Sequence, residues 1–119
     1  MVRKEFHKTV NQNMRGGKGE VTIEFILNPE ELLGHGRMFA KAILPSGSSI
    51  GRHEHLGEFE AYYVLKGEAT FVDNDGKTYT LKAGELGNIE CNQAHSVAND
   101  GTETMEMICL ILNERGVNK

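Results

Sequence analysis

Three side chains that can bind a metal lie close together near the middle of the chain. One residue separates His53 from His55, and Glu60 follows five residues after the second histidine. Alternate side chains of a β-strand share one face, so both imidazoles would point the same way from Cα atoms about 6.6 Å apart. Imidazoles at this spacing can converge on one ion at a nitrogen–metal distance of about 2 Å.

Glu60 begins the strand that follows this histidine pair. We expect residues 56–59 to turn the chain, and antiparallel pairing of the two strands then brings Glu60 back beside the histidines. Three ligands would therefore come from one hairpin. The other interpretation is a charged, exposed strand that happens to contain histidine, and the His-x-His pair alone does not decide between the two.

Short β-rich runs, separated by turns, surround these residues. The chain contains 14 glycines and 2 prolines, and turn signals recur along it. A short helix is expected at 28–34, and 11–19 and 82–88 are expected to be loops, the latter with a possible short strand. Strands are predicted over residues 20–27, 37–44, 50–55, 60–67, 68–73, 77–81, 95–99 and 104–112. This pattern favours an all-β barrel or sandwich, with residues 113–119 as an exposed tail.

Length and composition fit one ordinary globular domain. The chain has 119 residues, of which 39% are hydrophobic and 25% charged, and its net charge is −4. We expect no nucleic-acid partner, because no cluster of Lys and Arg dominates, and no membrane association, because no run approaches about 20 apolar residues. Two cysteines, Cys91 and Cys109, do not form a disulfide framework, so we expect a reduced, cytoplasmic setting.

The middle of the chain resembles a known motif. The stretch Gly47-x5-His53-x-His55-x4-Glu60-x6-Gly67 resembles the first motif of the cupin superfamily at each of its defining positions and spacings. The whole motif lies at 47–67. A match of this many fixed positions is specific, unlike the histidine pair taken alone.

A second stretch, at 84–99, resembles the second cupin motif in part. Gly84, His95 and Asn99 match that motif. Glu90 stands where proline is usual, and Asn92 stands where a second glycine is usual. Both departures concern the loop that precedes His95 and leave the histidine itself in place.

The resemblance implies a single cupin domain over residues 1–119, an antiparallel jelly-roll barrel with at most one short helix. It also implies four metal ligands, namely His53, His55, Glu60 and His95. Three imidazoles and one carboxylate suit one divalent transition metal per chain, which could be Mn, Fe, Ni, Co or Zn. Four protein ligands leave two positions of an octahedral ion open, whereas a closed structural zinc site would more often use cysteines, and neither cysteine is placed for that.

Open positions on an ion can hold an oxygen ligand, polarise a carbonyl or acidify a bound water. Cupins similar to this chain include dioxygenases, decarboxylases and isomerases, and some members only bind ligands. We therefore predict a metalloenzyme acting on a small oxygenated molecule, such as a carboxylate, keto acid, sugar or phenolic. A non-catalytic binding or sensing module is the alternative, and a scaffold that its metal merely stabilises is a third interpretation.

Strand alternation identifies further residues around the predicted site. Tyr62 shares a face with Glu60, so it can hydrogen-bond a substrate or simply fill the barrel. Glu58 lies in the turn, where it is a candidate proton shuttle or a solvated carboxylate. Tyr63 and Leu65 face outward, and we expect them to be covered in a homodimer.

The remaining candidates have plainer expected roles. Arg52 alternates with the histidines and should point away from the ion. His35 is expected to lie in a turn, with a place in the pocket as the alternative, and Cys91 to be a packed thiol, with a redox-active one as the alternative. Met105, Met107 and Cys109 share one face of the last strand and are expected in the core.

Overall fold

Ten β-strands and two short 3-10 segments make up the computed structural model, which describes residues 1–114. Each strand is short, as the spacing of the turn signals predicts. Their bounds are β1 (Lys8–Gln12), β2 (Glu20–Leu27), β3 (Gly36–Leu44), β4 (Ser49–Glu54), β5 (Glu58–Lys66), β6 (Glu68–Val72), β7 (Thr78–Lys82), β8 (Leu86–Ile89), β9 (Ala94–Ala98) and β10 (Met105–Asn113), with η1 (Met14–Gly16) and η2 (Pro29–Leu32) between them. Residues 115–119, most of the expected tail, lie outside the described part.

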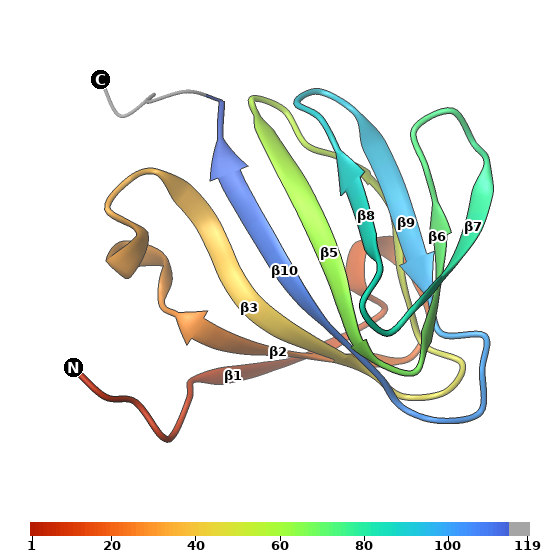
Figure 1. Cartoon of the computed structure of the whole chain (residues 1–119), viewed down its shortest axis with the longest axis horizontal. Helices are drawn as coiled ribbons and strands as arrows, with labels where there is room; N and C mark the ends of the chain where they lie inside the picture. Colours follow the sequence, from red (N-terminus) through yellow and green to blue (C-terminus); the bar gives the residue numbers. More distant parts are fainter. Residues whose placement is uncertain (115–119) are drawn as a thin grey trace.

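The strands form two sheets that face each other. One sheet has six strands in the order β1-β2-β3-β10-β5-β8, and the other has four in the order β4-β9-β6-β7 (Figure 1). All the strand pairs are antiparallel, which confirms the predicted all-β jelly-roll barrel.

The core lies between the two sheets and follows the alternation of each strand. On β10, Met105, Met107 and Cys109 are buried while their neighbours face the other side, which confirms the expected core residues. On β5, Tyr62 is buried and Tyr63 is exposed, as the alternation predicts. The side chains that line the barrel interior are therefore the ones that strand parity identifies.

The expected helix at 28–34 is a single 3-10 segment, η2. Pro29 opens it, and the Glu31 carboxylate accepts a hydrogen bond from the Asn28 backbone N–H at 2.7 Å. The Arg3 guanidinium holds the same carboxylate through two bonds of 2.8 Å. Leu33 adopts a left-handed φ of 56°, so the helix cannot continue beyond this point.

Two predictions about local structure are wrong. The segment at 11–19 is not simply a loop, because β1 extends to Gln12 and η1 occupies Met14–Gly16. The strands that carry the first three candidate ligands also do not form a hairpin. β4 pairs with β9, whereas β5 pairs with β10 and β8, so the turn between β4 and β5 carries the chain from one sheet to the other.

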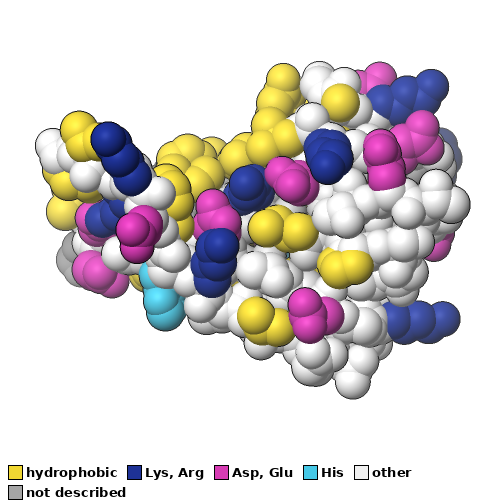
Figure 2. Space-filling model, turned by 90° about the horizontal axis from the view of Figure 1, so that it is seen from below, with side chains coloured by type: hydrophobic (Ala, Val, Ile, Leu, Met, Phe, Trp, Pro, Cys, Tyr) yellow, Lys and Arg dark blue, Asp and Glu magenta, His cyan; other side chains and the backbone are white. Residues whose placement is uncertain are grey.

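The surface mixes acidic and basic side chains. Seen from below, charges of both signs are interspersed, and hydrophobic side chains gather along one margin (Figure 2). No helix within residues 1–114 has the length and apolar character needed to cross a membrane.

Candidate metal centre

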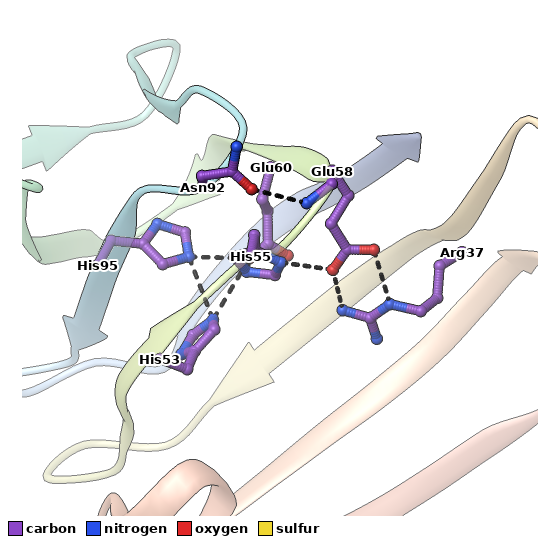
Figure 3. Close-up of polar contacts among 8 residues, drawn as sticks. Arg37, His53, His55, Glu58, Glu60, Asn92 and His95 are labelled. Atoms are coloured by element: carbon purple, nitrogen blue, oxygen red, sulfur yellow. Dashed lines mark hydrogen bonds and ion pairs between the residues drawn. The ribbon is translucent and has the colours of Figure 1, made fainter. Parts of the chain in front are cut away.

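Four side chains converge inside the barrel: His53, His55, Glu60 and His95. One possible ligand atom from each lies within 4.8 Å of all the others (Figure 3). Glu60 Oε1 lies 2.9 Å from His55 Nε2, 2.9 Å from His95 Nε2 and 3.6 Å from His53 Nε2. The arrangement brings together all four residues that the cupin motifs indicate.

Both sheets contribute to this cluster. His53 and His95 are directly opposite each other in the β4–β9 pair, and His55 follows the last residue of β4. Glu60 comes from β5 in the facing sheet, so the cluster forms across the barrel interior. His55, His95 and Glu60 are almost completely buried, with at most 3% of their surface exposed.

Hydrogen bonds at the outer ring nitrogens orient two of the imidazoles. His53 Nδ1 lies 2.7 Å from the Gly51 carbonyl oxygen, which can only accept, so this nitrogen carries the proton. His55 Nδ1 lies 2.8 Å from Glu58 Oε1, and Arg37 donates to both oxygens of that carboxylate at 2.6 and 3.1 Å (Figure 3). With the proton on Nδ1, the Nε2 lone pair of each ring faces the cluster.

This orientation leaves two acceptors in contact. Among residues 1–114, His55 Nε2 has no hydrogen-bond partner, although it lies 2.9 Å from the Glu60 carboxylate oxygen. A lone pair and a carboxylate repel each other at this distance unless a cation or a proton lies between them. The unpaired buried nitrogen therefore fits a metal ion, and it marks the side of the ring that the ion would occupy.

Electrostatics at the cluster favour an anionic Glu60. Burial alone would raise the pKa of its carboxyl group, but attraction to the three surrounding imidazoles outweighs burial and lowers that pKa. For His55, burial opposes protonation, but the carboxylates of Glu60 and Glu58 outweigh it and raise the pKa. Burial lowers the pKa of His95. A site that attracts a proton to His55 also attracts a metal cation.

The distances fit one ion. Two ligand atoms about 2.1 Å from an ion, at a right angle to each other, are about 3.0 Å apart. The contacts of Glu60 Oε1 with His55 Nε2 and His95 Nε2, at 2.9 Å each, are close to that value, and His95 Nε2 lies 3.2 Å from His53 Nε2. The donor set of nitrogen and oxygen suits a divalent transition metal.

A small cavity opens beside the cluster, with a volume of about 30 Å³. This volume admits about two water molecules. Its apolar lining includes Ile23, Met38, Ile50 and Ile111. Its polar lining, besides the cluster, comes from Arg15, Arg37 and Tyr62.

A comparison of the sequence with models of known families points to the same family as the motif, the fold and the cluster. A family model described as the cupin domain matches residues 40–111. The chain belongs to the cupin family. The match covers β4, β5 and β9, the strands that place the candidate ligands in this cupin.

Two comparisons return names that concern oxalate, both from Thermotoga maritima. An oxalate-binding protein of Thermotoga maritima is 45% identical over 100 residues, which are 84% of this cupin and 82% of the relative. A crystal structure of a predicted oxalate decarboxylase from Thermotoga maritima has a TM-score of 0.90 and 42% identity, over 95% of this cupin and 99% of that chain. The cupin domain of Cnp3 from Schizosaccharomyces pombe, with a TM-score of 0.71 and 12% identity over 88% and 68% of the two chains, shows the fold alone.

Tyr62 lies against the cluster. Its ring stacks on His95 with centroids 4.7 Å apart and planes 9° apart, and it meets Phe71 edge-on. Burial, together with the negative charge of Glu60, raises the pKa of the Tyr62 hydroxyl well above its usual value. Tyr62 therefore packs in the barrel and also lines the cavity as a neutral hydroxyl.

Glu58 is not a free loop carboxylate. Only 14% of its side chain is exposed, and it lies between the guanidinium of Arg37 and the ring of His55. Burial opposes ionisation, but hydrogen bonds from Arg37 and His55 outweigh it and lower the pKa of this carboxyl group. Glu58 is thus positioned to orient His55.

The departures from the second cupin motif have a structural explanation. Asn92 adopts the left-handed φ of 69° where glycine is usual, and asparagine tolerates this conformation better than most residues. Its side-chain oxygen accepts a hydrogen bond from the Gly57 N–H at 2.9 Å, which ties the loop before His95 to the turn after His55 (Figure 3). Glu90 donates its backbone N–H to the Gln93 side chain, a bond that proline, which has no N–H, could not make.

Other candidates from the sequence lie away from the cavity. Arg52 donates to the backbone carbonyls of Asp73 and Asn74 on the outside of β4. Cys91 is half-buried beside a surface depression. His35 donates its backbone N–H to Leu32 in a turn. None of the three lines the cavity.

Sequence reasoning missed two arginines of the cavity, Arg15 and Arg37. Arg37 stands at the start of a predicted strand, and Arg15 lies in a predicted loop, where no local pattern indicates a site. Asn13 and Arg15 adopt left-handed φ values of 52° and 55°, a conformation that sequence alone does not reveal for these residue types.

Proposed function

We propose that this cupin binds one divalent transition metal through His53, His55, Glu60 and His95 and uses it to bind oxalate or a similarly small dicarboxylate. The observation that carries the proposal is the buried contact between His55 Nε2 and Glu60 Oε1, two acceptors at 2.9 Å, beside a cavity of about 30 Å³. When bound, the ion would supply Lewis acidity and open coordination positions for carboxylate oxygens.

The residues around the cluster have separate tasks in this proposal. The Gly51 carbonyl and the Glu58 carboxylate fix the protons of His53 and His55 on Nδ1, so that both Nε2 atoms can coordinate. The Ile23 and Ile50 side chains exclude water from one part of the cavity, and Tyr62 presents a hydroxyl that stays protonated. These features serve to bind and orient a small anion.

The names of the relatives support oxalate as the ligand, and the cavity supports its size. A relative that is 45% identical is named an oxalate-binding protein. A cavity with room for about two water molecules favours a ligand of few atoms over a sugar or a phenolic ring. We therefore place small dicarboxylates before the other classes of oxygenated molecule.

Catalysis is the second candidate function, and the neutral hydroxyl of Tyr62 favours it. A structural relative at 42% identity is described as a predicted oxalate decarboxylase. Cleavage of a carbon–carbon bond in oxalate requires a proton for the product, and the hydroxyl of Tyr62, a residue that lines the cavity, is the candidate donor. Its raised pKa makes it a weak acid, and Glu58 is already bonded to Arg37 and His55, so binding without turnover is the better supported function.

Metal analysis and calorimetry test this proposal together. Protein purified without a histidine tag should carry one divalent transition metal per chain, and a His53→Ala/His95→Ala variant should lose it. Oxalate should bind the loaded protein and not the chelated protein. A wild-type protein that neither carries nor takes up metal would contradict the proposal, and the production of formate and carbon dioxide from oxalate would show the second candidate function.

We also propose that the chain forms a homodimer in the cytoplasm. Tyr63, Leu65 and Leu86 are 45%, 43% and 58% exposed, and Tyr63 and Leu86 are paired across β5 and β8. Exposed apolar side chains on a sheet face favour association with a second surface. Light scattering should give twice the mass of one chain, whereas a stable monomer would contradict the dimer. Cell fractionation tests the location.

A further inference from the structure

An arginine that pairs with no side chain of residues 1–114 lines the cavity from a segment outside both cupin motifs. This residue is Arg15, which lies in η1 and lines the cavity. Arg37, the other arginine of the cavity, comes from β3. Within residues 1–114, the Arg15 guanidinium makes no ion pair and no side-chain hydrogen bond, whereas Arg3 and Arg37 each hold a carboxylate. A cationic residue that lines the cavity and holds no carboxylate of the described chain is available to a ligand.

Contacts with β4 hold the backbone at Arg15 in an unfavourable conformation. Arg15 adopts a left-handed φ, which is unfavourable for a residue with a Cβ and persists only when the surroundings impose it. A Cβ on Gly51 would overlap the Arg15 carbonyl oxygen, so the segment lies directly against β4. Lys18 donates its N–H to Ser49 Oγ at 2.9 Å, and Ser49 donates its own N–H to the Lys18 carbonyl at 2.8 Å.

These contacts attach the segment to the strand that carries the cluster. Gly51 and Ser49 belong to β4, the same strand as His53, so the position of Arg15 is coupled to that of a candidate ligand. The strained backbone is therefore not a flexible loop tip. It holds one cationic side chain at the edge of the cavity.

The charges around the cavity favour a ligand with two negative charges. Arg37 and Glu58 neutralise each other through their paired hydrogen bonds. With neutral imidazoles, Glu60 balances one charge of a divalent ion, which leaves one positive charge at the cluster. Arg15 contributes a second one, so a dianion would be matched and a monoanion would not.

We propose that Arg15 binds the carboxylate oxygens of the ligand that the metal leaves free, and that it makes the site selective for dianions. This inference rests on the proposed function, because it assumes a small carboxylate in the metal cavity. A guanidinium suits this task, since its planar donors can bond two carboxylate oxygens at once.

The test is calorimetry of the manganese-loaded protein with oxalate and with oxamate. Oxamate has the shape of oxalate but replaces one carboxylate by an amide, so it carries a single negative charge. The Arg15→Gln variant should bind oxalate about 10- to 100-fold more weakly than the wild type, with a smaller loss for oxamate. The Arg15→Lys variant should retain part of the affinity, because it keeps the charge but loses the paired donors.

Arg52→Gln is the matched control. It removes an arginine from the outside of β4, so its affinity for oxalate should equal that of the wild type. The metal content of every variant should be unchanged. This measurement separates the loss of a contact with oxalate from a general loss of metal binding.

The outcomes distinguish the inference from the function on which it rests. If the loaded wild type binds no oxalate, the proposed function fails and this inference fails with it. If the wild type binds oxalate and Arg15→Gln binds it equally well, the role of Arg15 is refuted while the proposed function stands. Loss of metal in both Arg15→Gln and Arg15→Lys would also refute a ligand contact, because the residue would then act through the fold.

Discussion

Replacing Glu58 by glutamine tests whether a carboxylate outside the cluster controls its affinity for metal. Glu58 Oε1 lies 2.8 Å from His55 Nδ1, and Arg37 holds both oxygens of the same carboxylate. Glutamine keeps the size of the side chain but removes the charge that stabilises a proton on Nδ1 and enhances the basicity of Nε2. The amide can also present its N–H₂ group to the ring, which would favour the wrong tautomer.

The expected loss in metal affinity is about 10- to 100-fold, the range observed when a partner of a ligating histidine is removed. This corresponds to about 1.4 to 2.7 kcal/mol. The buried position of His55 argues for the upper part of this range, because water reaches the ring poorly and cannot replace the lost bond.

Competition with a chromophoric chelator measures this loss directly. Glu54→Gln is the matched control, since Glu54 lies between the two histidines on the same strand but is exposed and faces the other way. Arg37→Gln should have a smaller effect than Glu58→Gln, because the carboxylate remains beside His55. If Glu58→Gln binds metal within twofold of the wild type, the proposed orientation of His55 by Glu58 is refuted.

Four other changes have definite expected outcomes. Glu60→Gln should abolish binding of the divalent metal, because it removes the anion that the imidazoles face; metal analysis measures this. Gly51→Ala should destabilise the fold by about 1 to 3 kcal/mol in urea denaturation, because the new methyl group overlaps the backbone of the η1 segment. Met107→Ala should cost about 2 to 5 kcal/mol in the same assay, since Met107 is fully buried. Glu31→Gln should lower the free energy of unfolding at neutral pH, and this effect should vanish below pH 2, because Arg3 lowers the pKa of the Glu31 carboxyl group from 4.5 to about 2.

The sign of the Glu31 effect follows from its depressed pKa. The stabilisation is complete well above pH 4.5 and is lost as the pH falls through the folded-state pKa of about 2. An effect of Glu31→Gln that grew at low pH would contradict this account.

Gly47→Ala controls for Gly51→Ala, because Gly47 is a glycine whose Cβ would meet no other atom, although its positive φ adds some strain. Equal losses in these two variants would refute close packing of η1 on β4.

Much of the site could be predicted because strand alternation and motif spacing are local properties. The parity of β5 places Glu60 and Tyr62 inside and Tyr63 outside, and the structure shows this arrangement. The resemblance to the cupin motifs added His95, which no local pattern connects to His53. In the structure these two histidines are directly opposite each other in the β4–β9 pair.

The pairing of β4 could not be predicted from its neighbours. A short turn such as Leu56–Gly57 is compatible with a hairpin, but here it carries the chain between two sheets. The partner of β4 is decided by contacts with β9, far along the chain. The prediction of a hairpin therefore failed, although its conclusion that Glu60 meets the histidines was correct.

The position of Arg15 depends on a contact between η1 and β4 that no local sequence pattern predicts. The η1 segment lies against β4 because Gly17 and Gly51 allow their backbones to approach closely. Two glycines so far apart in the sequence look like ordinary turn or strand residues, and only the folded chain shows that they meet. Residues placed by such contacts are the ones that sequence reasoning misses.

The distribution of the cluster over both sheets links metal loading to the closure of the barrel. His53 and His95 belong to the four-stranded sheet and Glu60 to the six-stranded sheet, so a bound ion would join the two layers through coordinate bonds. A ligand that binds only the folded state at 100 times its dissociation constant adds about 2.7 kcal/mol to stability. The supply of metal would then set how long each molecule survives, and a chain that folds without metal would be the first to open and to be degraded.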